Sequence, residues 1–246
     1  MKKLFLLITV LSGFTVSLFA QAAGTTKTYQ MYNSMYVKAK PGEATQLEAA
    51  VTAHINKFHA TAPFQARFAV VTDGTGSDGW YFWSMGPLMY ADLDHQPDGN
   101  KDHDADWANN VDIHIEQYGE SNLWKLQEDM SVTPPNYHPD RADVWSIDIK
   151  PGMRFQFAEL MKKWKAMWEA KKYTYSLRVF YNDLWSSKGN DAVIIYSFNK
   201  YADFDDDISW RNDYESMYGA GSWDNFWKSW NECVASTDEH LRKYIK

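Results

Sequence analysis

Two arginines with matching surroundings are the side chains of this sequence best suited to binding a ligand. Arg67 and Arg178 each lie in the middle of a segment in which large apolar residues alternate with other residues. Such alternation predicts strands, and it places each arginine on the face opposite the large apolar side chains. A guanidinium group offers a planar fork of N–H donors that matches a carboxylate. The two arginines therefore predict a clamp for a small anionic ligand.

The alternative interpretation of the two arginines is structural. A buried guanidinium group is costly unless it is paired, so each arginine could form a salt bridge inside the protein, for example with Asp148. Strand alternation gives the same face to Tyr36, Lys38 and Asp148. We therefore expect one polar space that holds either a ligand or a salt-bridge network. The residues expected to line it are Arg67, Arg178, Tyr36, Lys38 and Asp148.

An acidic segment between residues 92 and 106 has oxygen-bearing side chains at alternate positions. Ca²⁺ prefers such ligands, and exported proteins meet calcium outside the cell. An EF-hand loop, however, needs glycine at its sixth position and glutamate at its twelfth, where this segment has His103 and Asn109. The alternative is a solvated acidic turn. The candidate calcium ligands are Asp98, Asn100, Asp102 and Asp104.

An internal repeat, with a spacing of about 110 residues, organises the sequence. A fixed repeat of this kind outranks local signals. It predicts a duplicated α+β unit, with a first copy over residues 27–130, a proline-containing linker over 131–141 and a second copy over 142–246. The repeated landmarks are Lys40-Pro41-Gly42 and Lys150-Pro151-Gly152, Arg67 and Arg178, Tyr90-Ala91-Asp92 and Tyr201-Ala202-Asp203, Tyr118-Gly119 and Tyr218-Gly219, and Leu123-Trp124-Lys125 and Phe226-Trp227-Lys228.

Each copy has the pattern of strand, helix, strand, strand, helix. Period-two alternation predicts strands at 29–39, 64–71 and 80–85, and again at 144–149, 175–182 and 193–198. The first helices are predicted by one apolar stripe written twice. Second helices are expected at 105–130 and 208–233, each broken near its Tyr-Gly. The two stripes are Leu47, Val51, His54 and Phe58, and Phe157, Met161, Trp164 and Trp168.

His54 invites a haem-binding or catalytic interpretation. Its counterpart in the repeat, however, is Trp164, at the same place on the same apolar stripe. A position that takes tryptophan in one copy is a packing position, so we interpret His54 as a core histidine with a satisfied ring nitrogen. His114, which shares a stripe with Trp107 and Val111, is interpreted in the same way.

The doubled unit carries a resemblance to a known fold family. Two such units in one chain can pack sheet against sheet and cover both bare faces. This arrangement resembles the dimeric α+β barrel superfamily, which includes antibiotic-biosynthesis monooxygenases, NIPSNAP-like proteins and haem-binding chlorite dismutases. The resemblance implies an α+β fold of two tandem ferredoxin-like repeats, packed as a pseudo-dimeric sandwich or barrel. It also implies a monooxygenase-like or haem-using enzyme, although no catalytic motif of the family is matched residue by residue.

The composition limits the setting of the protein. Residues 1–22 predict a signal peptide, because a charged start and an apolar stretch precede an Ala20-Gln21-Ala22 cleavage site. We therefore expect a periplasmic or secreted protein, with no membrane span after cleavage. The formal net charge of −7 argues against nucleic acid as a partner. Cys233 is the only cysteine, so the 12 Trp, 15 Tyr and 13 Phe residues, and not a disulfide, are expected to stabilise the core.

These observations favour an exported protein that binds a small ligand, anionic or aromatic, between or beneath the sheets. A monooxygenase-like or haem-using enzyme is the first alternative, and a structural protein without a small ligand is the second. Calcium and haem are the cofactors to be considered. The sequence leaves open the substrate, any catalysed reaction and the oligomeric state.

Overall fold

The computed structural model describes residues 28–95, 100–135, 138–184, 190–205 and 209–246. The expected signal peptide at 1–22 lies outside these residues, so export stays a prediction. Among the described helices, none combines the length and the apolar character needed to cross a membrane.

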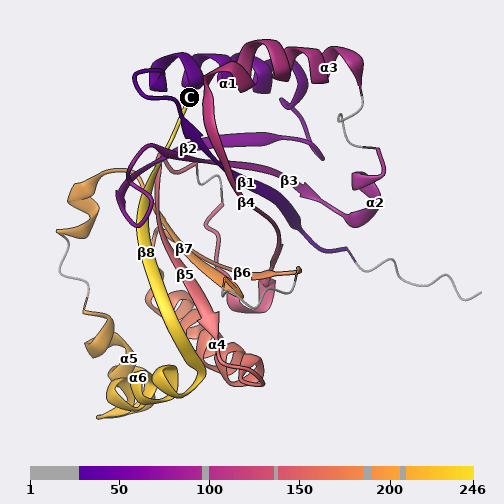
Figure 1. Ribbon diagram of the computed structural model, residues 1–246. Coiled ribbons are helices and arrows are strands. Elements are labelled where there is room, and N and C mark those ends of the chain that lie inside the picture. The colour runs from indigo at the N-terminus through magenta and orange to yellow at the C-terminus, as the bar shows by residue number, and fades with distance from the viewer. Residues whose placement is uncertain (1–27, 96–99, 136–137, 185–189, 206–208) are drawn as a thin grey trace, which may run out of the picture.

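Eight antiparallel strands close into a barrel in the order β1-β3-β2-β8-β5-β7-β6-β4 (Figure 1). The first half of the chain contributes the run β4-β1-β3-β2, and the second half contributes β8-β5-β7-β6. The two runs match strand for strand, as expected for a duplicated α+β unit. The strands are β1 (Met31–Ala39), β2 (Ala66–Gly74), β3 (Trp80–Leu88), β4 (Ile115–Leu126), β5 (Arg141–Ile149), β6 (Ser176–Asn182), β7 (Ala192–Phe198) and β8 (Val234–Tyr244).

Helices cover the barrel on two opposite sides (Figure 1). Those of the first half lie on one side and those of the second half on the other. The barrel wall therefore has an inner face toward its own cavity and an outer face toward the helices. The helices are α1 (Ala44–Phe58), α2 (Tyr90–Leu93), α3 (Lys101–Asp106), α4 (Arg154–Lys171), α5 (Trp210–Tyr218) and α6 (Ser222–Cys233), with single π or 3₁₀ turns at Trp107–Val111, Asp112–His114, Glu128–Met130 and Tyr201–Phe204.

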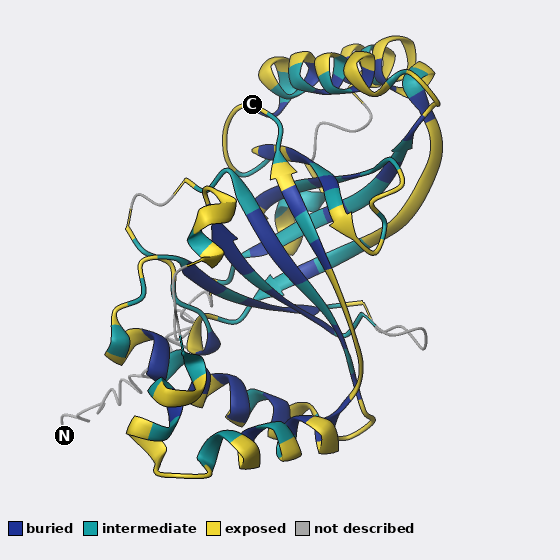
Figure 2. Cartoon of the chain, turned by 90° about the vertical axis from the view of Figure 1, so that its left-hand side faces the viewer, coloured by how far each residue is buried: buried dark blue, intermediate teal, exposed yellow. Residues whose placement is uncertain are grey.

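The predicted apolar stripes of α1 and α4 face the sheet. Leu47, Val51 and His54 are the buried residues of α1, and Trp164 is among those of α4. Figure 2 shows the resulting pattern, with buried residues on the sheet-facing side of the long helices and exposed residues outside. Each Lys-Pro-Gly turn that leads into these helices has its glycine in the left-handed region, with φ of +82° and +80°, where a side chain would be strained.

The second helix expected at 105–130 is wrong over most of its length. Helical turns end at His114, and residues 115–126 form strand β4. The reason is tertiary pairing, because β4 supplies hydrogen-bond partners to both β1 and β6 and so closes the barrel. The helix expected at 208–233 is right over its described residues, where α5 and α6 lie, and the predicted break is present because α5 ends at Tyr218 with Gly219 as its C-cap.

Two of the repeated landmarks are consequently not equivalent. Tyr118-Gly119 lies in strand β4, whereas Tyr218-Gly219 lies at the end of helix α5. Leu123-Trp124-Lys125 is also in β4, whereas Phe226-Trp227-Lys228 is in α6. Each copy has a fourth strand that the predicted pattern lacked, and in the second copy it is β8. The complete unit is β-α-β-β-α-β, the full ferredoxin-like pattern.

Candidate functional site

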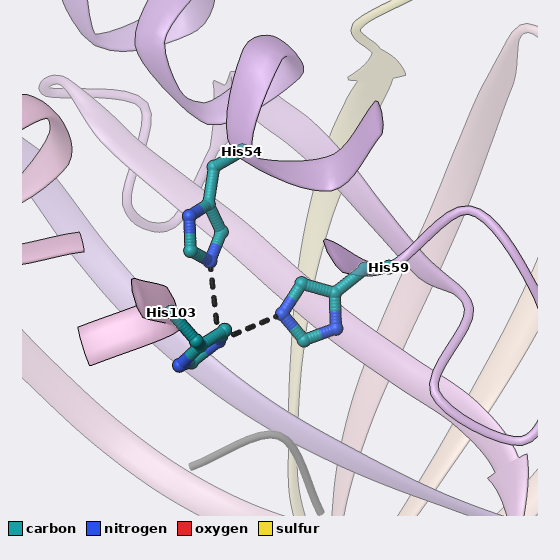
Figure 3. Close-up of side chains that lie close together, drawn as sticks. All are labelled: His54, His59 and His103. Carbon is teal, nitrogen blue, oxygen red and sulfur yellow. Dashed lines mark hydrogen bonds between the residues drawn. The ribbon is translucent and has the colours of Figure 1, made fainter. Parts of the chain in front are cut away.

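Three buried histidines meet between the helices of the first half and the outer face of the sheet (Figure 3). His54 is on α1, His59 is the first residue after the end of α1, and His103 is on α3. Their exposed fractions are 1%, 2% and 6%. The backbone of His59 is no longer helical, with φ −128° and ψ 29°. Its ring can therefore turn back toward the other two. These three residues form the three-histidine cluster.

One nitrogen of each ring points into the three-histidine cluster. The Nε2 atom of His103 lies 3.3 Å from Nε2 of His54 and 3.1 Å from Nε2 of His59. One ring nitrogen from each histidine lies within 4.8 Å of the other two. In a tetrahedral zinc site with bonds of about 2.05 Å, neighbouring ligand nitrogens are about 3.3 Å apart. Two of the three separations in the cluster are therefore close to those of a metal-bound set, and the third is within 4.8 Å.

The Nδ1 atoms of the three rings face oxygen acceptors outside the cluster, whereas the Nε2 atoms face one another. Nδ1 of His54 is 2.8 Å from an Asp106 carboxylate oxygen, and Nδ1 of His59 is 3.0 Å from the carbonyl oxygen of Phe64. Nδ1 of His103 is 3.1 Å from an Asp104 carboxylate oxygen. These oxygens accept hydrogen bonds, which favours the tautomer that has the proton on each Nδ1. In a neutral ring, Nε2 then carries the lone pair, as in histidines that bind metals.

Burial keeps two of the three rings neutral. Burial lowers the pKa of His54, and it lowers the pKa of His59 to about 4. Lone pairs that face one another at about 3 Å repel unless a positive charge lies between them. A single extra proton bridges only one pair of nitrogens. A metal ion at the centre satisfies all three together.

The pH dependence of stability gives a first prediction. The unfolded chain takes up a proton on His59 near pH 6.5, whereas the folded chain does so only near pH 4, so this contribution is complete above 6.5 and is lost as the pH falls toward 4. For metal-free protein we expect His59 alone to remove about 2 kcal/mol between pH 7 and pH 5.

The measurement must separate His59 from a group that acts in the opposite direction. Burial, followed by the charge of Glu239, raises the pKa of Asp143 to about 7, so this carboxyl favours the folded state at lower pH. Urea unfolding of the metal-free wild type and of His59→Gln at pH 7 and pH 5 isolates the histidine. Equal pH slopes in the two proteins would show that His59 is not a buried neutral ring.

Asp106 links the three-histidine cluster to the helix surface. One oxygen accepts from His54, and the other lies 3.2 Å from both Nζ of Lys57 and Nδ2 of Asn110. The hydrogen bond from His54, followed by that from Lys57, lowers the pKa of Asp106. The carboxylate therefore stays ionised and fixes the His54 ring, as the outer carboxylates of metal sites do.

A cavity of about 330 Å³ adjoins the three-histidine cluster. Its walls combine apolar and polar side chains, and Tyr118 has a hydroxyl that donates to Asp112 over 2.6 Å and accepts from Trp107 over 2.9 Å. A metal ion held by the three histidines would meet water or substrate in this cavity. Besides the histidines and Asp104, the lining residues are Asn33, Met35, Trp83, Met85, Trp107, Tyr118 and Ser121.

Haem does not fit the three-histidine cluster. Two pairs of Nε2 atoms lie at hydrogen-bond distance, which leaves no space for a porphyrin plane between the rings. The described residues that line the barrel cavity include tyrosines but no histidine, cysteine or methionine, so histidine, thiolate and thioether ligation of haem have no ligand there.

The histidines show what the sequence interpretation missed. His54 is buried on the apolar stripe, as expected, but its inner nitrogen faces two other histidines and not a packing contact. The prediction that His114 lies in the core is wrong. This residue is partly exposed, and its Nδ1 lies 2.8 Å from a Glu43 carboxylate oxygen. The available signal was His54 and His59 at the end of one helix; nothing local ties them to His103.

The last part of the acidic segment is a helix, α3, and not a loop. Asn100 accepts a hydrogen bond from the Asp102 backbone N–H and caps helix α3, which contains Asp102 and Asp104. Residues two apart on a helix do not face each other, so alternate positions do not gather around one ion. Asp98 lies outside the described residues. The expected loop is wrong over Lys101–Asp106, and calcium binding stays a prediction.

The barrel interior holds a second cavity, of about 390 Å³. Arg67, Arg178 and Tyr36 line it, with Arg67 exposed to solvent. Lys38 and Asp148 are not among its described lining residues, since Lys38 pairs with Asp78 at 2.8 Å and Asp148 interacts with Asp191. The alternative salt bridge between Arg178 and Asp148 is also absent from the described ion pairs.

Comparison with known proteins supports the fold. No family model matches the chain, and no curated protein matches it by sequence. A candidate monooxygenase from Lactobacillus acidophilus NCFM superposes with a TM-score of 0.59 at 9% identity, covering 89% of this chain and 95% of that one. A candidate monooxygenase from Fusobacterium nucleatum gives 0.56 at 12% identity, covering 89% and 94%. An anthrone oxidase-like protein gives 0.53 at 8% identity, covering 90% and 93%.

The chain therefore has the fold of the dimeric α+β barrel proteins. In this protein the two ferredoxin-like units are tandem halves of one polypeptide, so the barrel is complete within a single chain.

Proposed function

We propose that the protein is a metal-dependent enzyme that acts on a small molecule in the cavity beside the three-histidine cluster. The observation that carries this proposal is the convergence of three buried Nε2 atoms while every Nδ1 faces an acceptor. Imidazole ligands suit Zn²⁺, Cu²⁺, Fe²⁺ and Ni²⁺, so the ion is a divalent first-row transition metal. The fold supports an enzyme, because its structural neighbours include candidate monooxygenases and an anthrone oxidase-like protein.

Each residue has a defined part in this proposal. The three imidazoles would hold the ion beside the cavity, and the ion would supply Lewis-acid chemistry to a substrate oxygen there. Asp106 holds the His54 ring with its lone pair inward. Trp107 and Trp83 pack against His54 and His59 at ring-centroid distances of 5.1 and 5.0 Å, which restricts water at the ligand rings.

The cavity walls indicate the substrate class. Met35, Trp83, Met85 and Trp107 offer apolar and aromatic contact surface, whereas the polar groups come from Asn33, Asp104, Tyr118 and Ser121. Sites of this composition orient a mainly apolar ligand through a small number of hydrogen bonds. We therefore expect a small aromatic compound that bears at least one oxygen.

The first test is metal content. Protein prepared without a polyhistidine tag, treated with chelator and then titrated with Zn²⁺ or Co²⁺, is expected to bind one ion per chain. Calorimetry counts the Zn²⁺ sites, and the visible spectrum of bound Co²⁺ reports the coordination geometry. Binding far below one equivalent at saturating metal would overturn the proposal.

The hydrogen bond between Asp106 and His54 gives a prediction about metal affinity. Replacing Asp106 with asparagine removes the charged acceptor of His54, and such outer-layer changes weaken metal binding about 10- to 100-fold. Competition with a metal-binding dye measures the change. Asp112→Asn is a matched control, because Asp112 accepts from Tyr118 and does not contact a ring of the cluster. An equal loss in both variants would assign the effect to general electrostatics.

A further inference from the structure

We propose that the barrel interior is a second binding site, which takes a small aromatic carboxylate. This proposal does not depend on the metal centre, because the barrel cavity and the three-histidine cluster lie on opposite faces of the sheet and share no lining residue. Four observations support it: a buried arginine, a donor without a partner, the charge of the lining and its aromatic walls.

Arg242 on β8 is the buried arginine, with an exposed fraction of 5%. Its guanidinium donates to Tyr36 Oη at 2.5 Å and to His240 Nε2 at 2.9 Å, and it lies 3.6 Å from the centre of the Phe82 ring. All three partners are uncharged. His240 is neutral because burial, with the nearby charge of Arg242, lowers its pKa to about 3.

The positive charge of Arg242 has no negative partner on the described part of the chain. No ion pair joins a carboxylate to Arg242, Arg178 or Arg67 among the described residues. A buried guanidinium that lacks a counter-charge is costly, and a bound anion offsets that cost. Binding of an anionic ligand inside the barrel would therefore offset the cost of burying the Arg242 guanidinium group.

Arg178 supplies the donor without a partner. Its Nη2 group donates to Tyr32 Oη at 3.1 Å, and its guanidinium lies 4.8 Å from the centre of the Phe180 ring. Its Nε atom is buried and has no hydrogen-bond partner. Buried donors are nearly always satisfied, so an unsatisfied one beside a cavity indicates a ligand acceptor.

The lining as a whole favours an aromatic anion. Three arginines line the cavity, and Glu120 is the one acidic residue among the described lining residues. Glu120 accepts a hydrogen bond from Asn190 Nδ2 at 2.9 Å, and no ion pair joins it to an arginine among the described residues. The cavity volume of about 390 Å³ suits a small ligand. The aromatic walls, which favour a flat ring, are Tyr32, Tyr36, Phe82, Trp124 and Phe180.

Benzoate and benzamide test the proposal as a charged and a neutral probe of the same shape. We expect benzoate to bind the wild-type protein at least 10-fold more tightly than benzamide, measured by calorimetry. Arg242→Met and Arg178→Met are each expected to weaken benzoate binding at least 10-fold. Arg141→Met is the matched control, because Arg141 stacks on Tyr201 and does not line the cavity.

Two further measurements make the outcome decisive. Without ligand, Arg242→Met should melt at the same temperature as the wild type or higher, because it removes an uncompensated buried charge. A clear fall in melting temperature would assign Arg242 to a structural pair instead. Benzoate should also bind His59→Gln unchanged, which separates this site from the metal centre. Equal binding of benzoate and benzamide, or no binding of either at 10 mM, would overturn the proposal.

Discussion

Replacing His59 with glutamine is expected to abolish tight metal binding. The change removes one of three ligand nitrogens, and it leaves the ion with two imidazoles and an incomplete shell. Outer-layer changes already cost about 10- to 100-fold in metal affinity, so we expect the loss of a ligand to cost at least about 100-fold. Dye competition with Zn²⁺ measures the affinity, and elemental analysis measures the metal retained after purification.

His114→Gln is the control for this experiment. His114 is partly exposed and pairs with Glu43, so its loss should leave the Zn²⁺ affinity within about twofold. Circular dichroism and the elution volume show whether His59→Gln keeps the fold. An unchanged affinity in a folded His59→Gln protein contradicts the metal centre; a similar loss in both variants points to adventitious binding by surface histidines.

The largest effect on stability is expected at Trp164, the counterpart of His54 in the second half. Trp164 is fully buried, and its ring lies within 6.5 Å of the rings of Trp210, Trp223 and Phe226. Truncation to alanine leaves a large cavity, so Trp164→Ala should lower the free energy of unfolding by about 3–5 kcal/mol. Guanidinium unfolding followed by circular dichroism measures this change.

Trp164→Phe is the conservative partner of that variant. The Nε1 atom of Trp164 is buried without a hydrogen-bond partner, so phenylalanine keeps most of the ring contacts and removes an unsatisfied donor. We expect a loss below about 1.5 kcal/mol. If alanine and phenylalanine cost the same, the ring contacts of Trp164 do not support the second half in the way that its burial indicates.

Particular residues show how far the sequence could predict this structure. The apolar stripes of α1 and α4 and the Lys-Pro-Gly turns depend on local spacing, so they could be predicted. Residues 115–126 could not, because their strand is defined by pairing with β1 and β6, which are distant in the sequence. A mostly polar segment of this kind has no strong local preference, and barrel closure decides its conformation.

The candidate sites divide in the same way. Alternation along the strands placed Arg67, Arg178 and Tyr36 on the cavity face, since the side-chain period of two is local. Arg242 was missed because β8 itself was missed, and with it the buried guanidinium inside the barrel. The three-histidine cluster joins residues 44 positions apart through the packing of α3 on α1, which no spacing in the sequence announces.

Because both halves belong to one polypeptide, their sequences can differ, which the subunits of a symmetric homodimer cannot do. In a dimer of identical subunits each substitution occurs twice, so any change that creates a site in one subunit also alters the packing of the other. Here position 54 is histidine while the matching position 164 is tryptophan within an aromatic cluster. The first half can therefore carry the three-histidine cluster while the second half keeps an apolar core at the matching position. The pseudo-twofold relation survives in the backbone and is broken in the side chains.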